Sequence, residues 1–274
     1  MNLTIRTLFF FSTLSLIFFS ACNKEKLEDY KLTKDYGTAN FAIDDTKDIV
    51  DYQFASNATA RLSALACNEV TVTVENVDNF ATPDTLTIDF GSSNIFCFGK
   101  LRRGKIIAIR TAPYLQSAST TTISFEDYYV NNHKVDGSKT VTNNGVNSDG
   151  NLSFGITKDI EISLTNGNEI SWTANRTREW MAGANTPWNI ADDIYQIEGT
   201  SSGYHSSGGS FGVIISTPIV FDMSCWSDGA CARVSGVTQV LPPNGNTRII
   251  DYGDGTCNCN RTITVNDITY SVTF

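Results

Sequence analysis

The sequence predicts an all-β fold, a large antiparallel meander that forms a sandwich or an open barrel, preceded by a tether and one short N-terminal helix. From Cys67 onward apolar and polar side chains alternate, for example at residues 70–74, 85–90 and 105–109. This period of two is typical of strands with one buried face. Turn sequences such as Asp136-Gly137 separate the alternating segments. Because no helical pattern lies between them, neighbouring strands are expected to pair antiparallel.

The first 21 residues are expected to be a cleaved signal peptide. Apolar residues 8–19 follow Arg6, and the small residues Ser20 and Ala21 precede Cys22. A stretch of about a dozen apolar residues is shorter than the roughly 20 that a membrane-spanning helix needs, and small residues before the cut suit a signal peptidase. Ser20-Ala21-Cys22 resembles the lipobox of bacterial lipoproteins, which implies palmitate or similar acyl chains on Cys22. An ordinary secretory signal with a spare thiol at Cys22 is the alternative.

Residues 22–48 are expected to form the lipidated cysteine and a flexible tether, and residues 49–274 a single all-β domain. The tether is predicted because the segment is rich in charged side chains and holds little to bury. Within residues 46–66 the apolar side chains recur at spacings of three and four, which predicts a short helix. Asp45 or Thr46 is suited to cap it.

The charge balance limits the partners of this chain. It carries 29 acidic and 20 basic residues, a net charge of −9. Nucleic-acid binding depends on clustered Lys and Arg, so nucleic acid is excluded as a partner, and docking on anionic lipid is disfavoured. The expected partners are a lipid bilayer, reached through acyl chains on Cys22, and a glycan or a protein at the cell surface.

A repeated layout of cysteines predicts disulfides. The sequence Ile-Asp-Phe-Gly at 88–91 precedes Cys97 and a basic residue, and Ile-Asp-Tyr-Gly at 250–253 precedes Cys257 and a basic residue. Each unit has one cysteine upstream, so in an oxidising compartment we expect the pairs Cys67–Cys97 and Cys225–Cys257. Cys231 and Cys259 are left to pair, although on a strand Cys257 and Cys259 would face the same way and could exchange roles. A thiolate metal site is the alternative, but the Cys-x-Cys spacing is poor for zinc, and no metal is expected.

Catalytic residues and cofactors are not predicted, and the chain is expected to be non-enzymatic. His133 and His205 fall in turn or loop sequences, and neither a nucleophile elbow nor a cofactor loop is present. A surface glycan hydrolase is the alternative, because glycosidases use two facing carboxyl groups. The adjacent acids Glu126, Asp127, Asp192 and Asp193 are its candidates, although adjacent acids are more typical of surfaces and turns.

A tryptophan-rich segment contains the candidate binding patch. Aromatic and guanidinium side chains together can hold a sugar or a peptide, and this patch consists of Trp180, Trp188, Arg176 and Arg178. We favour the alternative in which Trp172 and Trp180 pack in the core beside paired charges. In that case Trp188 is the tryptophan expected at the surface.

The order of several motifs resembles that of a known group. These motifs are residues 129–145, Arg176-Thr-Arg-Glu-Trp180 and Asp251-Tyr-Gly-Asp-Gly-Thr-Cys257. Over most of residues 60–274 they resemble a group of uncharacterised Bacteroidota outer-membrane lipoproteins. The resemblance implies lipid anchoring to the outer membrane, facing the periplasm or the cell surface, and brings no activity or ligand with it. We therefore expect a binding or structural module at the cell envelope.

Overall fold

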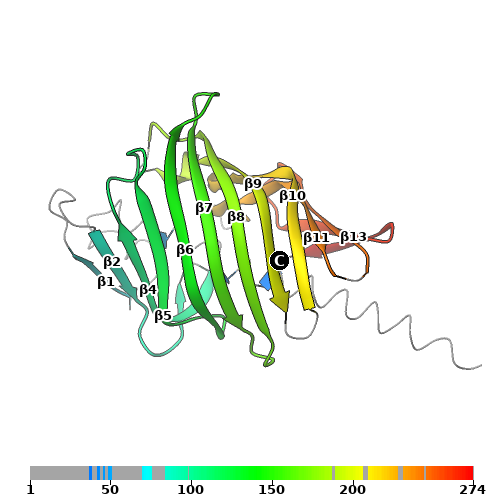
Figure 1. Cartoon of the computed structure of the whole chain (residues 1–274), viewed down its shortest axis with the longest axis horizontal. Coiled ribbons are helices and arrows are strands. Elements are labelled where there is room, and N and C mark those ends of the chain that lie inside the picture. The colour runs from blue at the N-terminus through cyan, green and yellow to red at the C-terminus, as the bar shows by residue number, and fades with distance from the viewer. Residues whose placement is uncertain are drawn as a thin grey trace, which may run out of the picture.

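The computed structural model describes residues 37–38, 42–43, 46, 49–50, 70–75, 84–97, 99–186, 189–205, 209–227, 231–243 and 245–273. Its strands form one antiparallel sheet in the order β1-β2-β4-β5-β6-β7-β8-β9-β10-β11-β12-β13-β14, with β3 paired to β4 (Figure 1). The strands are β1 (Thr71–Glu75), β2 (Asp84–Asp89), β3 (Ile95–Cys97), β4 (Lys100–Arg110), β5 (Thr120–Val130), β6 (His133–Val146), β7 (Leu152–Ser163), β8 (Glu169–Ala182), β9 (Ile194–His205), β10 (Gly209–Asp222), β11 (Arg233–Leu241), β12 (Arg248–Asp254), β13 (Asn260–Val265) and β14 (Ile268–Thr273). The 3-10 helix η2 (Ile190–Asp192) precedes β9, and the helix α3 (Met223–Ser227) follows β10.

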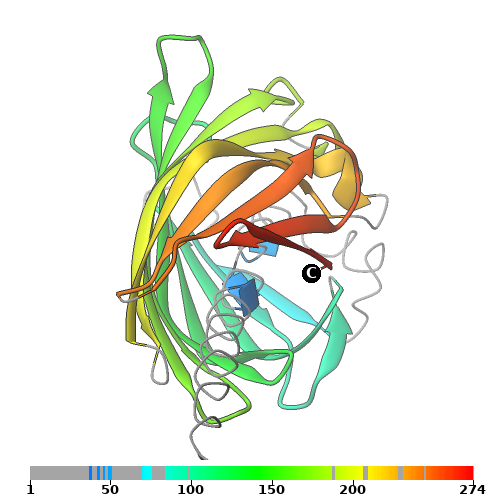
Figure 2. The same cartoon turned by 90° about the vertical axis from the view of Figure 1, so that its right-hand side faces the viewer.

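The sheet curls into an open barrel. Figure 2 shows its strands wrapping around a central space, and the edge strands β1 and β14 do not pair with each other in the described sheet. The predicted all-β antiparallel fold is confirmed, and of the two expected architectures the chain adopts the open barrel. Consecutive strands pair almost throughout, which is the meander that short turn sequences favour.

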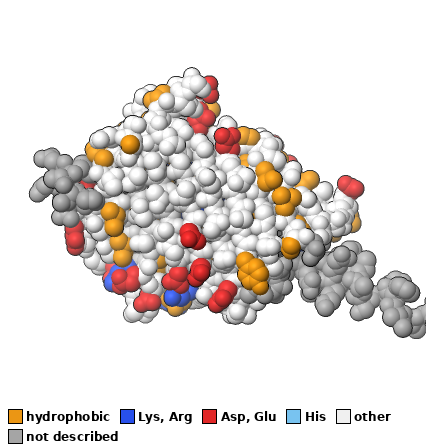
Figure 3. Space-filling model, in the orientation of Figure 1, with side chains coloured by type: hydrophobic (Ala, Val, Ile, Leu, Met, Phe, Trp, Pro, Cys, Tyr) orange, Lys and Arg blue, Asp and Glu red, His pale blue; other side chains and the backbone are white. Residues whose placement is uncertain are grey.

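Alternation of side chains gives the sheet a buried concave face and a polar convex face. In β8 buried and non-buried residues alternate from Glu169 to Met181, so that Trp172 and Trp180 point inward while Thr173 and Asn175 are exposed. The convex side faces the viewer in Figure 3, where backbone and side chains that are neither hydrophobic nor charged dominate, and Asp and Glu are more evident than Lys and Arg. The period of two in the sequence therefore predicted the burial as well as the strands.

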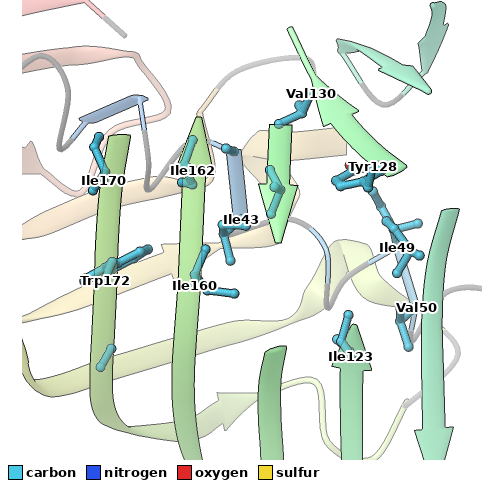
Figure 4. Close-up of a cluster of buried hydrophobic side chains, with 14 of the residues drawn as sticks. Ile43, Ile49, Val50, Ile123, Tyr128, Val130, Ile160, Ile162, Ile170 and Trp172 are labelled. Atoms are coloured by element: carbon cyan, nitrogen blue, oxygen red, sulfur yellow. The ribbon is translucent and has the colours of Figure 1, made fainter. Parts of the chain in front are cut away.

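Helical residues from the N-terminal part of the chain pack against the concave face. Ile43, Ile49 and Val50 have no exposed surface and belong to the larger hydrophobic cluster. Figure 4 shows these side chains beside Ile123 and Ile160 of the sheet. The sheet is open along one side, so the strands alone would leave part of its apolar concave face in water. Apolar helical residues that pack against this face bury that surface.

This helical segment differs from the expected tether. Ala42, Ile43 and Thr46 lie within residues 22–48, yet they are helical and buried, and the Thr46 hydroxyl donates to the Ile43 carbonyl at 2.8 Å. The apolar residues Ala42 and Ile43 continue, on the N-terminal side, the spacing that predicted a helix from Thr46. The charged residues around them obscure this spacing in the sequence. Residues 47–48 and 51–66 of the expected helix, and Cys22, lie outside the described residues. Within the part of the chain that is described, helices fall short of the length and apolarity that crossing a membrane requires.

Disulfides join the region after β10 to the last strands. Cys225 pairs with Cys257 and Cys231 with Cys259, with Cα atoms 5.1 and 5.2 Å apart. Both predicted pairings are confirmed. Cys97 is also disulfide-bonded, whereas Cys67, its predicted partner, lies outside the described residues.

The repeated sequence unit folds alike at both occurrences. Asp89 Oδ1 accepts a hydrogen bond from the Gly91 amide at 2.8 Å, and Asp251 Oδ1 accepts one from the Gly253 amide at 2.9 Å. Both glycines have a positive φ, which a residue without Cβ adopts at little cost. The aromatic residue between each pair is buried. The two units therefore form the same aspartate-capped turn, one near each edge of the sheet.

Buried arginines complete both units. Arg102 Nε donates to the Cys97 carbonyl at 3.1 Å, and a second nitrogen donates to the Tyr128 hydroxyl. Arg261 Nη1 donates to the Tyr252 carbonyl at 3.0 Å. Burial, and next the nearby Arg233, lower the pKa of Arg261. In both places an arginine satisfies backbone carbonyls around the cysteine-bearing turn, which explains why a basic residue follows each turn in the sequence.

Candidate anion-binding pocket

A row of cationic side chains crosses the concave face between the two hydrophobic clusters. Lys139 of β6, Lys158 of β7 and Arg176 and Arg178 of β8 are all buried, with at most 7% of their surface exposed. Lys139 lies directly opposite Lys158 in the pairing of β6 with β7. Like charges directly opposite each other repel, although both lysines also have other interactions within the chain.

These cations line a pocket together with apolar and aromatic side chains. Its volume is ≈ 50 Å³, space for a few water molecules or one small anionic group. Five of the described lining residues are Lys or Arg, and none of those described is Asp or Glu. The lining comprises Lys139, Ile156, Lys158, Arg176, Arg178, Tyr195, Ile197, Ile219, Phe221, Met223 and Arg233.

Aromatic rings support the cations. Lys158 Nζ lies 4.6 Å from the ring centroid of Trp172, and Arg176 Cζ lies 5.3 Å from the same centroid. Arg178 Cζ is 4.7 Å from the rings of both Phe154 and Tyr195. Cation–π contacts of this kind contribute about 2 kcal/mol where the charge is desolvated. The rings therefore offset part of the cost of burying positive charge and hold the cations at the pocket wall.

Arg176 keeps hydrogen-bonding capacity toward the pocket. Its Nη2 lies 3.4 Å from Ser201 Oγ, a long contact, and its buried Nε finds no acceptor among the described residues. Buried N–H groups are almost always hydrogen-bonded, so this one needs an explanation. Lys139, Lys158, Arg178 and Arg233 have further interactions within the chain.

Asp193 organises one wall of the pocket. Its carboxylate accepts a hydrogen bond from Trp180 Nε1 at 3.1 Å and another from the Tyr195 hydroxyl at 2.6 Å, and its backbone carbonyl accepts the Met223 amide at 2.9 Å. Burial raises the pKa of Tyr195, the nearby Arg178 opposes this, and the negative charge of Asp193 adds to it. Tyr195 therefore stays a neutral hydrogen-bond donor. The carboxylate of Asp193 links β8 with β9, and its backbone carbonyl contacts α3.

The predicted patch residues lie inside the molecule. Arg176 and Arg178 line the pocket, and Trp180 is buried in the smaller hydrophobic cluster, where its ring is tilted against that of Tyr195. They therefore present no outer surface patch, and the core-packing alternative describes Trp180 better. Trp188 lies outside the described residues.

Sequence reasoning missed Lys139, Lys158 and Arg233. A signal was present, because Lys158 takes the inward position between Ile156 and Ile160 in a strand with a period of two. A cation in the apolar phase of a buried strand needs a partner, and this pattern marks such positions as candidate sites.

The candidate carboxylates lie in separate surroundings. Glu126 is exposed and forms an ion pair with Lys105 at 2.6 Å, and Asp127 is exposed with a positive φ. Asp192 is exposed and accepts a hydrogen bond from a threonine hydroxyl, whereas Asp193 is buried. None of these contacts brings two carboxyl groups face to face across a cleft, which is the arrangement that glycoside hydrolysis needs.

The histidines and metal ligands give no catalytic grouping either. His133 Nδ1 accepts the Thr165 amide at 3.3 Å, and His205, expected in a solvated loop, is buried at the end of β9. Among the described residues, His, Cys, Asp and Glu do not gather in groups of three or more that could hold a metal ion.

Comparison with known proteins adds no relative. No family model matches the chain, and no curated protein or solved structure matches it either.

Proposed function

We propose that this chain is a non-enzymatic binding protein of the cell envelope, held at a membrane by acyl chains on Cys22, and that its ligand presents an anionic group to the pocket. The observation that carries the proposal is the five-cation lining of one pocket in a chain of net charge −9. A cationic pocket inside an acidic molecule attracts anions there and repels them elsewhere.

The burial of these cations supports binding over a purely structural role. Burying a cation costs several kcal/mol unless other groups compensate. Hydrophobic residues fill the inward positions on either side of the row, including Val141, Phe154 and Ile160. Arg176 is the member of this row that supports binding most directly, because its buried Nε has no acceptor among the described residues.

The first test measures anion binding by the full chain, purified in a neutral detergent. Sulfate, phosphate and glucuronate are titrated by calorimetry and by thermal shift. We expect saturable binding whose affinity falls only modestly as salt rises, because buried charge is screened much less than exposed charge. The variant Lys139→Gln/Lys158→Gln is expected to lose at least tenfold in affinity.

The matched control removes the same charge from the surface. Lys105→Gln/Lys134→Gln neutralises two lysines whose ion pairs lie outside the pocket. This control is expected to keep the affinity of the unmodified chain. Circular dichroism checks that each variant is folded. Equal affinity for both variants, or no binding of any anion by the unmodified chain, contradicts the proposal.

The membrane anchor has its own test. Cys22→Ala, or globomycin treatment of the cells, is expected to leave an unprocessed precursor, because the lipobox-like sequence requires acylation before cleavage. The measurement is the mass of the protein recovered from membranes. A processed and freely soluble product from Cys22→Ala refutes lipid anchoring without affecting the pocket.

A further inference from the structure

The last strand of the sheet has a free edge. β14 pairs with β13 on one side, and none of the described strands pairs with it on the other. Figure 2 shows β14, at the red end of the colour bar, beside the opening of the barrel. We infer that this edge pairs with β14 of a second copy of the chain, so that one antiparallel ladder joins two barrels. The inference is independent of the pocket and its ligand.

The turn before β14 determines which backbone groups face the free edge. Residues 266–267 have φ values of 51° and 60°, which is typical of a type I′ hairpin turn. Val265 and Ile268 flank this turn as a hydrogen-bonded pair, and hydrogen-bonded and non-hydrogen-bonded pairs then alternate along the hairpin. The N–H and C=O groups of Thr269 and Ser271 therefore point away from β13, toward the free edge.

β14 lacks the features that usually protect an edge strand. Its sequence, Ile-Thr-Tyr-Ser-Val-Thr, contains neither a charged residue nor a proline, and its pairing with β13 continues without a bulge. Ile268 and Tyr270 are 48% and 47% exposed. Natural sheets prevent pairing between edges with charges, prolines and bulges, so a regular, uncharged and exposed edge is suited to accept another strand.

A second copy of β14 complements this edge. In an antiparallel pair centred on Tyr270, Ile268 lies opposite Val272 of the second copy. Thr269 then lies opposite Ser271, and these two residues exchange their outward N–H and C=O groups. Directly opposite residues share a face of the sheet, so apolar side chains meet apolar ones and hydroxyl groups meet hydroxyl groups. The interface is self-complementary, as a two-fold dimer requires.

Charge also favours this edge as the meeting point of two copies. The chain has a net charge of −9, so two copies repel each other wherever acidic side chains come together. Beside the edge, Ile249, Thr264 and Thr269 lie in register across β12, β13 and β14 and carry no charge. Two copies can therefore pair along β14 without placing one acidic side chain opposite another.

The first test measures the mass of the full chain in neutral detergent by sedimentation. We expect a dimer that forms as the protein concentration rises. Ser271→Pro removes an N–H that faces the free edge, a position where edge strands tolerate proline, and should weaken the dimer at least tenfold. Thr269→Lys/Ser271→Lys keeps every backbone donor and places lysines opposite lysines across the ladder, so we expect a loss of at least the same size.

The matched control adds the same charge in the middle of the sheet. Ser171 and Asn175 are exposed positions of β8, far along the strand order from β14. Ser171→Lys/Asn175→Lys is expected to dimerise as the unmodified chain does. Circular dichroism checks that each variant is folded.

A cysteine trap tests the position of the two-fold axis in membranes. Opposite Cα atoms in a non-hydrogen-bonded pair are about 4.5 Å apart, which a disulfide can span. Tyr270→Cys should therefore give a dimer on mild oxidation that reduction separates. Tyr204→Cys is the control, since Tyr204 is 53% exposed but lies on β9, and it should remain monomeric.

The outcomes separate pairing through β14 from other association. A concentration-dependent dimer that both β14 variants weaken, together with cross-linking of Tyr270→Cys, supports the inference. A monomer at every concentration, a dimer that neither β14 variant weakens, or cross-linking of Tyr204→Cys as complete as that of Tyr270→Cys overturns it. Anion binding is measured separately, so these results leave the proposed function to its own test.

Discussion

Removal of the Asp193 carboxylate is expected to destabilise the fold strongly, because this side chain is buried and accepts hydrogen bonds from two buried donors. A hydrogen bond to a charged group contributes about 1.5–3 kcal/mol, so Asp193→Ala should lower the free energy of unfolding by about 3–5 kcal/mol. Asp193→Asn keeps the size and one good acceptor, and we expect a smaller loss of about 1–2 kcal/mol.

Urea unfolding followed by tryptophan fluorescence measures both losses, with the midpoints compared at a shared slope. Asp192→Ala is the matched control. Its carboxylate is exposed and accepts from the Thr186 hydroxyl at 2.7 Å, so its removal should change stability by no more than about 0.5 kcal/mol. The variant Tyr195→Phe tests the pairing, since its effect should be non-additive with Asp193→Ala.

Two results contradict this reasoning about the pocket wall. The first is a loss below about 1 kcal/mol for Asp193→Ala, since two lost charge-assisted hydrogen bonds cannot cost so little in a buried site. The second is simple additivity of Asp193→Ala and Tyr195→Phe. Either result means that Asp193 does not hold Trp180 and Tyr195 in the way that the contacts indicate.

Three further predictions concern a disulfide, a glycine of β4 and the loss of stability at acid pH. Loss of the Cys225–Cys257 disulfide in a double serine variant should lower the free energy of unfolding by about 2–4 kcal/mol, measured by urea unfolding; no change would contradict it. Gly104→Ala should lower the free energy of unfolding by more than about 3 kcal/mol, because a Cβ at this positive φ overlaps the backbone of the facing strand. Gly91 also has a positive φ but open space around it, so Gly91→Ala should lower it by only about 1–2 kcal/mol. Equal shifts of the melting temperature in the two variants would refute this. Hydrogen bonds from two asparagine side chains lower the pKa of Glu179 from its ordinary 4.5, so its carboxylate adds stability above pH 4.5 that is lost as pH falls through the lower folded-state pKa. In a series of melting temperatures measured at different pH, Glu179→Gln should reduce the fall in melting temperature at acid pH. An unchanged fall would contradict this prediction.

Local sequence patterns were enough to predict most of the fold. The alternation in β8 predicted both a strand and its inward face, because side-chain direction in a strand depends only on the position along it. The choice between sandwich and open barrel was left open, since closure depends on how the distant edges β1 and β14 meet. The buried Ile43 was missed because its burial depends on a sheet that lies far along the chain and on apolar residues within a charged segment.

The site was predictable in part. Arg176 and Arg178 were singled out with Trp180, and they do lie close together, but the tryptophan packs inside and supports the wall. Lys139 and Lys158 are brought face to face by the register of β6 with β7, which a single sequence does not specify. The sequence did show that each lysine occupies a position where the alternation of its strand calls for an apolar side chain. A search for Lys and Arg at such positions would have found both.

The most direct test of the central claim is a crystal structure of the chain soaked in tungstate, a heavy analogue of phosphate. We predict an anomalous peak inside the pocket, within hydrogen-bond reach of Arg176 Nε and in contact with the lysines of β6 and β7. An empty pocket at saturating tungstate, or a carboxylate of the chain itself filling the position between these cations, would contradict it.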